Sequence, residues 1–133
     1  MDPKMIWANL AVTDLARTAK FYTELGFKPN GANSSNELVS FSFGEADFVI
    51  NFFLKDVLRA NLKIELADPH YLAEVVFTLS ANDSEQVDNW ALEVEKAGGK
   101  LISRPSAFGD GYYGFLFADP DGHRFNVFYM EGL

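Results

Sequence analysis

The chain has 133 residues, a formal net charge of −8 and no cysteine, and 48% of its residues are hydrophobic. The missing cysteines exclude disulfide frameworks and thiolate metal sites, and the few Lys and Arg residues argue against a nucleic-acid partner. No apolar run is long enough to span a membrane and no export signal is visible, so we expect one cytoplasmic domain over residues 1–133 without a membrane partner.

The first half of the sequence predicts a strand, a helix and three further strands. Residues 5–12 alternate between apolar and mixed positions, which is typical of a strand. Thr13 and Asp14 supply a helix cap, and apolar residues then recur at helical spacing until Gly26. After this helix, three strands are expected at residues 28–33, 38–43 and 48–54.

The second half repeats this order. Residues 74–80 alternate as a strand, and Asp83 with Gln86 three positions later forms a capping-box-like pair at the start of a helix. The apolar stripe of this helix ends at Gly98. Three more strands are expected at residues 100–103, 112–118 and 124–130.

The repeated order indicates an internal duplication of a βαβββ module. The first module spans about residues 5–54 and the second about residues 74–131. Residues 55–73 are interpreted as a connector with a helical turn near residues 56–61. Each module has one amphipathic helix to cover the apolar face of its sheet.

The opposite faces of the first and last strands mix aromatic rings with amides and hydroxyls. These positions hold Trp7, Asn9, Asn51, Phe53, Thr78, Asn126 and Phe128. One interpretation is a concave ligand site, in which apolar walls give affinity and a few polar groups fix orientation. The alternative is a half-buried sheet interface in which the amides are already hydrogen-bonded. The pattern leaves both open.

Three motifs carry a resemblance to a known family. They are the strand and cap from Asn9 to Leu15, the segment from Lys20 to Phe27, and the segment from Phe117 to His123. With the paired modules, they make the chain resemble the vicinal oxygen chelate superfamily, which includes glyoxalase I, bleomycin-resistance proteins and extradiol dioxygenases, over about Met5 to Met130. The resemblance implies an α+β fold, in which two tandem βαβββ modules with curled mixed sheets enclose a cavity, and a homodimer.

The resemblance also implies four metal-ligand positions, on the first and last strands of the modules. They fall on Trp7, Asn51, Val76 and Asn126. Indole and isopropyl groups are not metal ligands, and neutral amides alone bind hard cations weakly. We therefore expect no metal and no other cofactor.

The remaining candidates for chemistry are few. The histidines are His70 in the connector and His123 in the last turn, and we interpret both as exposed or structural. Glu74 is the acidic residue best placed for the cavity, although a solvated strand end is the favoured interpretation. No catalytic residue is assigned, and whether the protein is an enzyme stays open, with non-enzymatic binding preferred.

Two classes of function remain. The preferred one is a metal-free protein of the glyoxalase/bleomycin-resistance type that binds a small molecule. The most specific hypothesis for its ligand is a cationic antibiotic of the bleomycin kind. The alternative is a glyoxalase-like lyase or isomerase that acts on a small carbonyl or thiol conjugate with a non-standard metal site. The expected ligand-binding residues are Trp7, Asn9, Asn51, Phe53, Glu74, Thr78, Asn126 and Phe128.

Overall fold

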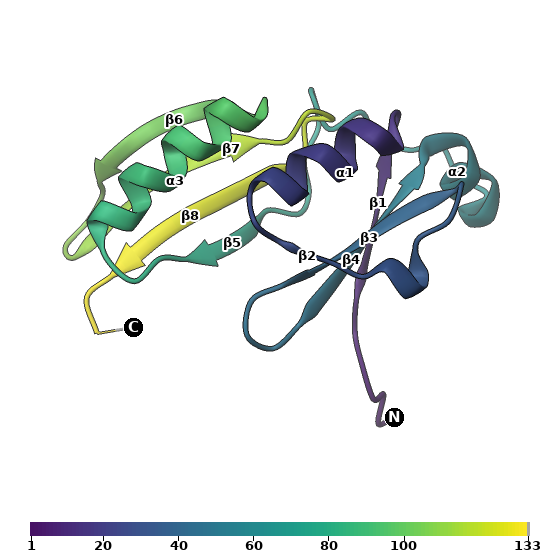
Figure 1. Ribbon diagram of the computed structural model, residues 1–133, viewed down its shortest axis with the longest axis horizontal. Coiled ribbons are helices and arrows are strands. Elements are labelled where there is room, and N and C mark those ends of the chain that lie inside the picture. Colours follow the sequence, from purple (N-terminus) through teal and green to yellow (C-terminus); the bar gives the residue numbers. More distant parts are fainter. Residues whose placement is uncertain (133) are drawn as a thin grey trace. The chain divides into compact units, whose positions relative to one another are not determined.

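The computed structural model describes residues 1–132. The chain divides into two compact units, Met1–Leu66 and Ala67–Leu133, which we call the first unit and the second unit. Each unit contains a four-stranded mixed sheet with a helix packed on it (Figure 1). The predicted α+β fold with two βαβββ modules is thereby confirmed.

The sheet of the first unit has the strand order β1-β4-β3-β2. Strand β1 runs parallel to β4, and the other neighbours are antiparallel. The elements are β1 (Ala8–Val12), α1 (Leu15–Glu24), β2 (Lys28–Pro29), the 3-10 turn η1 (Gly31–Asn33), β3 (Leu38–Phe43), β4 (Phe48–Leu54) and α2 (Lys55–Leu62).

Three predictions for the first unit need correction. Strand β1 begins at Ala8, which pairs with Ile50, rather than at Met5. The strand expected at residues 28–33 stops at Pro29 and continues as η1, since proline has no N–H for the ladder. The expected helical turn in the connector is the eight-residue helix α2.

The core of the first unit is built around the ring of Tyr22. This α1 residue is 0% exposed, and its ring stacks on Phe52 with the ring centroids 4.5 Å apart. Four more rings surround it within 6.1 Å, those of Phe21, Phe27, Phe41 and Phe43. Helix α1 is held in place by Asp14, whose side chain accepts a hydrogen bond from the backbone N–H of Arg17, as the sequence predicted.

The sheet of the second unit has the matching order β5-β8-β7-β6, with β5 parallel to β8. Its elements are β5 (Phe77–Ser80), α3 (Ser84–Ala97), β6 (Lys100–Ala107), β7 (Tyr112–Ala118) and β8 (Arg124–Met130). Figure 1 shows α3 lying along β6, β7 and β8, and the core on this face contains Phe117 stacked on Phe125.

Two strand predictions for the second unit are also wrong. Strand β5 begins at Phe77 rather than Glu74, because its partner β8 begins at Arg124 and has no residue opposite Glu74 or Val75. Strand β6 extends to Ala107, well beyond the predicted end at Ser103. Shifts of register interrupt its pairing with β7, and such irregularities hide the alternation that marks a strand in the sequence.

The N-terminus of α3 follows the predicted capping pattern. Asp83 accepts a hydrogen bond from the backbone N–H of Gln86 at 2.7 Å, and the Gln86 side chain accepts one from the backbone N–H of Asn82 at 2.8 Å. The helix then buries Val87, Ala91 and Val94. Within residues 1–132, no helix is long and apolar enough to cross a membrane.

A side-chain hydrogen bond links α3 to the sheet and makes stability depend on pH. The Tyr113 hydroxyl donates to Asp88 Oδ1 at 2.6 Å, and this bond, more than desolvation or the charge of Asp88, raises the pKa of Tyr113. Because the neutral hydroxyl makes this bond, the bond stabilises the fold fully below about pH 10, the pKa of an unperturbed tyrosine. This contribution is lost as the pH rises through the raised pKa of the folded state.

We therefore expect urea unfolding between about pH 9 and 11 to show a steeper loss of stability for the natural protein than for Tyr113→Phe. Tyr112→Phe is the control, because it removes the hydroxyl of the neighbouring β7 residue and leaves the bond between Tyr113 and Asp88 intact. Parallel losses in the natural protein and in Tyr113→Phe would contradict the proposed role of this bond.

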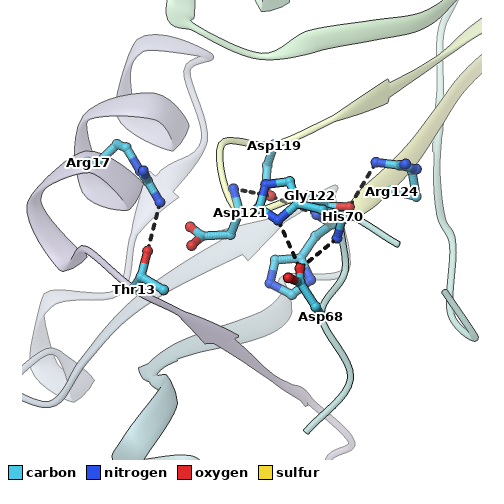
Figure 2. A network of polar contacts seen from close by, with 9 residues as sticks. Thr13, Arg17, Asp68, His70, Asp119, Asp121, Gly122 and Arg124 are labelled. Atoms are coloured by element: carbon cyan, nitrogen blue, oxygen red, sulfur yellow. Dashed lines mark hydrogen bonds and ion pairs between the residues drawn. The ribbon is translucent and has the colours of Figure 1, made fainter. Parts of the chain in front are cut away.

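The turn before β8 is fixed by Asp119 and by a close approach to the connector. Asp119 Oδ1 accepts hydrogen bonds from the backbone N–H groups of Asp121 and His123. Gly122, with φ of +96°, packs so closely that a Cβ atom would lie 2.7 Å from the backbone nitrogen of His70. Figure 2 shows this packing and the bond of 2.9 Å between His70 Nδ1 and Asp68 Oδ1. Both histidines thus belong to the structure of the turn region.

Candidate ligand-binding site

In the first unit, four polar side chains form a hydrogen-bonded row across the sheet. Asn30 Nδ2 donates to Ser40 Oγ at 3.3 Å, and Ser40 Oγ donates to Asn51 Oδ1 at 2.7 Å. Asn51 Nδ2 then donates to Asn9 Oδ1 at 3.3 Å. Ser40 is 1% exposed. The carboxamide of Asn51 therefore uses both its oxygen and its nitrogen inside the first unit.

The equivalent row of the second unit has the same register but different chemistry. Thr78 pairs with Asn126, which pairs with Leu116, and Leu116 pairs with Ser103. Leu116 stands where the first unit has Ser40, so the neighbour of Asn126 on β7 has no hydroxyl to donate to the amide oxygen. Within residues 1–132, neither the Asn126 carboxamide nor the Thr78 hydroxyl has a hydrogen-bond partner. Both groups are free to bind a ligand.

These free groups face a cavity of about 440 Å³ on the second unit. Its volume lies in the usual range for small-molecule sites. The lining residues come from all four strands and the loop after β6, and none of them carries a charge. They are Thr78, Ser103, Ser106, Phe108, Gly114, Phe115, Leu116, Asn126, Val127 and Phe128.

Three aromatic rings form a cluster beside the cavity. Tyr112 stacks on Phe128 with centroids 5.9 Å apart and an interplanar angle of 12°, and on Phe108 at 5.8 Å and 21°. Phe108 is 50% exposed and Tyr112 is 37% exposed. Partly exposed parallel rings present flat faces on which another planar group can stack.

Gly114 has no side chain, and this leaves space for Phe128 to pack. It lies opposite Phe128 in the ladder between β7 and β8. A Cβ atom at this position would overlap the carbonyl oxygen of Val127 and would lie 2.8 Å from Cβ of Phe128. The floor of the cavity can therefore hold glycine alone without moving β8.

The structure divides the predicted site residues between the two units. Thr78, Asn126 and Phe128 lie together around the cavity of the second unit. The other five do not line this cavity. Asn9 and Asn51 belong to the hydrogen-bonded row, Phe53 is half-buried on β4, Trp7 precedes β1 and is 53% exposed, and Glu74 is exposed in a bend before β5.

Sequence reasoning missed several lining residues, among them Ser103, Ser106, Phe108 and Leu116. Ser106 and Phe108 were hidden by the bulges of β6, since residues beyond 103 were not expected to be in a strand. Gly114 did give a usable signal, because a lone glycine inside a strand often marks a close backbone approach.

The residues at the implied metal positions do not fit a divalent cation. Trp7 and Val76 lie before their strands, and Asn51 Oδ1 is occupied by the hydroxyl of Ser40. Asn126 would be left to supply one neutral oxygen, whereas zinc sites of this kind use several imidazole, thiolate or carboxylate ligands. Within residues 1–132, no three His, Asp or Glu side chains form a group that could hold a metal ion.

Asn51→Leu and Asn126→Leu form a matched pair with different expected results. Asn51→Leu removes the acceptor of the buried Ser40 hydroxyl and should lower the free energy of unfolding by about 1–3 kcal/mol. Asn126→Leu breaks no bond within residues 1–132 and should change stability by less than about 0.5 kcal/mol. Urea unfolding checks both values, and equal losses would contradict the distinction between the two rows.

Comparison with known proteins places the chain among related sequences and structures. The family model of the Glyoxalase/Bleomycin resistance protein/Dioxygenase superfamily matches residues 4–127. A hypothetical protein from S. aureus has a similar structure, with 30% identity, a TM-score of 0.85, and coverage of 97% of this chain and 95% of that chain. No curated protein sequence matches the chain.

Two more distant structures share the fold. A glyoxalase-related enzyme from Fulvimarina pelagi is 21% identical, with a TM-score of 0.82 and coverage of 96% of this chain and 88% of that chain. Lactoylglutathione lyase from Agrobacterium tumefaciens is 20% identical, with a TM-score of 0.67 and coverage of 97% of this chain and 96% of that chain. At these identities the likeness concerns the fold alone.

Proposed function

Because the chain belongs to the glyoxalase/bleomycin resistance protein/dioxygenase superfamily, we propose that it binds a small molecule without a metal, in the cavity of the second unit. The observation that carries this proposal is the Asn126 carboxamide, which lines the cavity and has no partner within residues 1–132. An unpaired amide in an apolar cavity is stabilised when a ligand supplies the missing hydrogen bonds. The rings of Phe108 and Phe128 supply the apolar contacts beside it.

The chemistry of the lining favours binding over catalysis. The lining residues offer hydroxyls, one amide and aromatic or aliphatic surface, and none of them is an acid or base that titrates near neutral pH. A glyoxalase-like lyase moves protons and therefore needs such a group within reach of its substrate. The lyase alternative thus has less support than binding, and the lyase from Agrobacterium tumefaciens shares the fold at only 20% identity.

A ligand screen on chelator-treated protein tests this function. The library contains cationic glycopeptides, glutathione conjugates and aromatic metabolites, and binding is measured as a rise in melting temperature. We expect hits that lose their effect in Asn126→Leu and Phe128→Ala and keep it in Trp7→Ala, because Trp7 does not line the cavity. Hits that need added metal, or that depend on Trp7 rather than Phe128, would contradict the proposed site.

We further propose that the protein forms a homodimer. The support is a set of exposed apolar side chains just before β1 and β5: Met5, Ile6, Trp7, Val75 and Val76 are each at least 44% exposed. Exposed apolar side chains of this kind are commonly buried against a second copy in symmetric oligomers. Light scattering at micromolar concentration should give about twice the chain mass of 14.9 kDa. A single species of 14.9 kDa at all concentrations would refute the dimer.

A further inference from the structure

We infer that the cavity of the second unit selects an uncharged, planar ring that carries a hydrogen-bond donor and an acceptor side by side, as a lactam does. The inference rests on the proposed function and names its ligand class. The role of Leu116 is then to keep the Asn126 carboxamide available to the ligand. Three features of the cavity support it: the partner of Asn126 in the ladder, the stacked rings and the absence of charge in the lining.

The first feature is the difference between Leu116 and Ser40. Both residues pair with the asparagine of their row, Leu116 with Asn126 and Ser40 with Asn51. The Ser40 hydroxyl donates to Asn51 Oδ1 at 2.7 Å and so occupies the acceptor end of that amide. The leucine side chain has no hydrogen-bonding group. The Asn126 amide therefore keeps both its donor and its acceptor for a ligand.

A free carboxamide recognises a particular kind of edge. Its NH₂ group donates and its oxygen accepts in one plane, so it pairs with a ligand edge that has an acceptor and a donor next to each other. A cyclic amide presents such an edge within the plane of its ring. A ring nitrogen without an attached hydrogen offers only an acceptor and would form half of this pair.

The second feature is the ring cluster, which favours a flat ligand. Phe108 and Phe128 both line the cavity with Asn126, and Tyr112 stacks on each of them with interplanar angles of 21° and 12°. Aromatic rings bind one another best in offset stacks or edge-to-face pairs, with centroids about 4.5–7 Å apart. A ligand ring can use the cluster in this way while its edge meets Asn126.

The third feature is the lack of charge, which argues against a cationic ligand. None of the lining residues is acidic or basic, and Glu74 lies outside the lining. A cation that enters the cavity gives up hydration, and the lining offers ring faces but no counter-charge to offset that cost. The net charge of −8 acts from other parts of the surface and is screened over about 10 Å at 0.1 M salt. A bleomycin-like cation therefore does not suit this cavity.

Three probes with similar two-ring skeletons test the inference by calorimetry: 2-quinolinone, quinoline and N-methylquinolinium. We expect 2-quinolinone to bind about tenfold more tightly than quinoline, because it can form both hydrogen bonds with Asn126. N-methylquinolinium should bind more weakly than 2-quinolinone at both 20 mM and 200 mM salt. Equal affinity for 2-quinolinone and quinoline, or tighter binding of N-methylquinolinium, would overturn the inference.

Two variants of similar size test the role assigned to Leu116. Leu116→Ser introduces a hydroxyl beside Asn126, as Ser40 lies beside Asn51, and should reduce the preference for 2-quinolinone over quinoline to about twofold or less. Leu116→Ala opens the same space without a hydroxyl and should keep the preference near tenfold. Identical preferences in the two variants would refute the assignment.

The failure of this inference can be told apart from the failure of the proposed function. If none of the three probes binds, the lactam class is wrong, whereas the wider library still decides whether the cavity binds a small molecule at all. If the library gives hits that depend on Asn126 but lack a donor–acceptor edge, the proposed function is supported and the lactam class is wrong.

Discussion

Replacing Tyr22 by alanine is expected to lower the free energy of unfolding of the first unit by about 3–5 kcal/mol, the usual cost of removing a large buried aromatic ring. The Tyr22 side chain is 0% exposed and stacks on Phe52 with centroids 4.5 Å apart. It also lies within 6.1 Å of four other rings, which cannot all move into the space it would leave. Such a loss is a large part of the stability of a small domain.

Urea unfolding followed by circular dichroism measures this loss, with Tyr22→Phe as the matched control. Tyr22→Phe keeps the ring and should lose less than half as much stability. A Tyr22→Ala variant that unfolds within 1 kcal/mol of the natural protein would show that the ring cluster does not hold the first unit together. The ligand affinity of the folded Tyr22→Ala protein should stay unchanged, because the cavity lies in the second unit.

Replacing Gly114 by alanine is expected to lower the free energy of unfolding by about 2–3 kcal/mol and to abolish ligand binding. The new Cβ atom would overlap the carbonyl oxygen of Val127, a backbone atom that cannot move without shifting β8. It would also lie 2.8 Å from Cβ of Phe128. The shift displaces Phe128 and Asn126 together, since both lie on β8.

Gly31→Ala is the control for this substitution. Gly31 lies in η1, has no heavy atom within 4 Å of a Cβ and does not adopt a positive φ. Alanine there should leave stability and binding unchanged, or raise stability slightly because the unfolded chain becomes less flexible. If Gly114→Ala behaves like Gly31→Ala in urea unfolding and in ligand titration, the close packing at the cavity floor is not required.

Much of the fold could be predicted from the sequence where local signals were strong. Strands β3, β4, β7 and β8 begin and end at the predicted residues. Alternation marks β3, β4 and β8, and β7 is an aromatic-rich run between two sets of turn residues. The caps at Asp14 and Asp83 were also correct, since an N-cap is a local interaction. The first strand of each unit began later than predicted because its length depends on the neighbouring strand.

The candidate site was harder to predict because it depends on neighbours across the sheet. The sequence treats Asn51 and Asn126 as equivalent, and both lie on the mixed face of the last strand of their module. Their difference comes from Ser40 and Leu116, which meet them only through strand register. In the same way, Phe108 joins the cavity through a loop that follows an irregular strand, which no local pattern indicates.

The most direct test of metal-free binding at Asn126 is a titration of ¹⁵N-labelled protein in excess chelator with the tightest hit of the ligand screen. The side-chain NH₂ resonances of the asparagines are followed and assigned with the Asn51→Leu and Asn126→Leu variants. The proposed site predicts that the Asn126 NH₂ resonances shift with saturation and that those of Asn51 do not, because Asn51 is already bonded to Ser40 and Asn9. Shifts at Asn51 with none at Asn126, or shifts that appear only after a divalent metal is added, would contradict it.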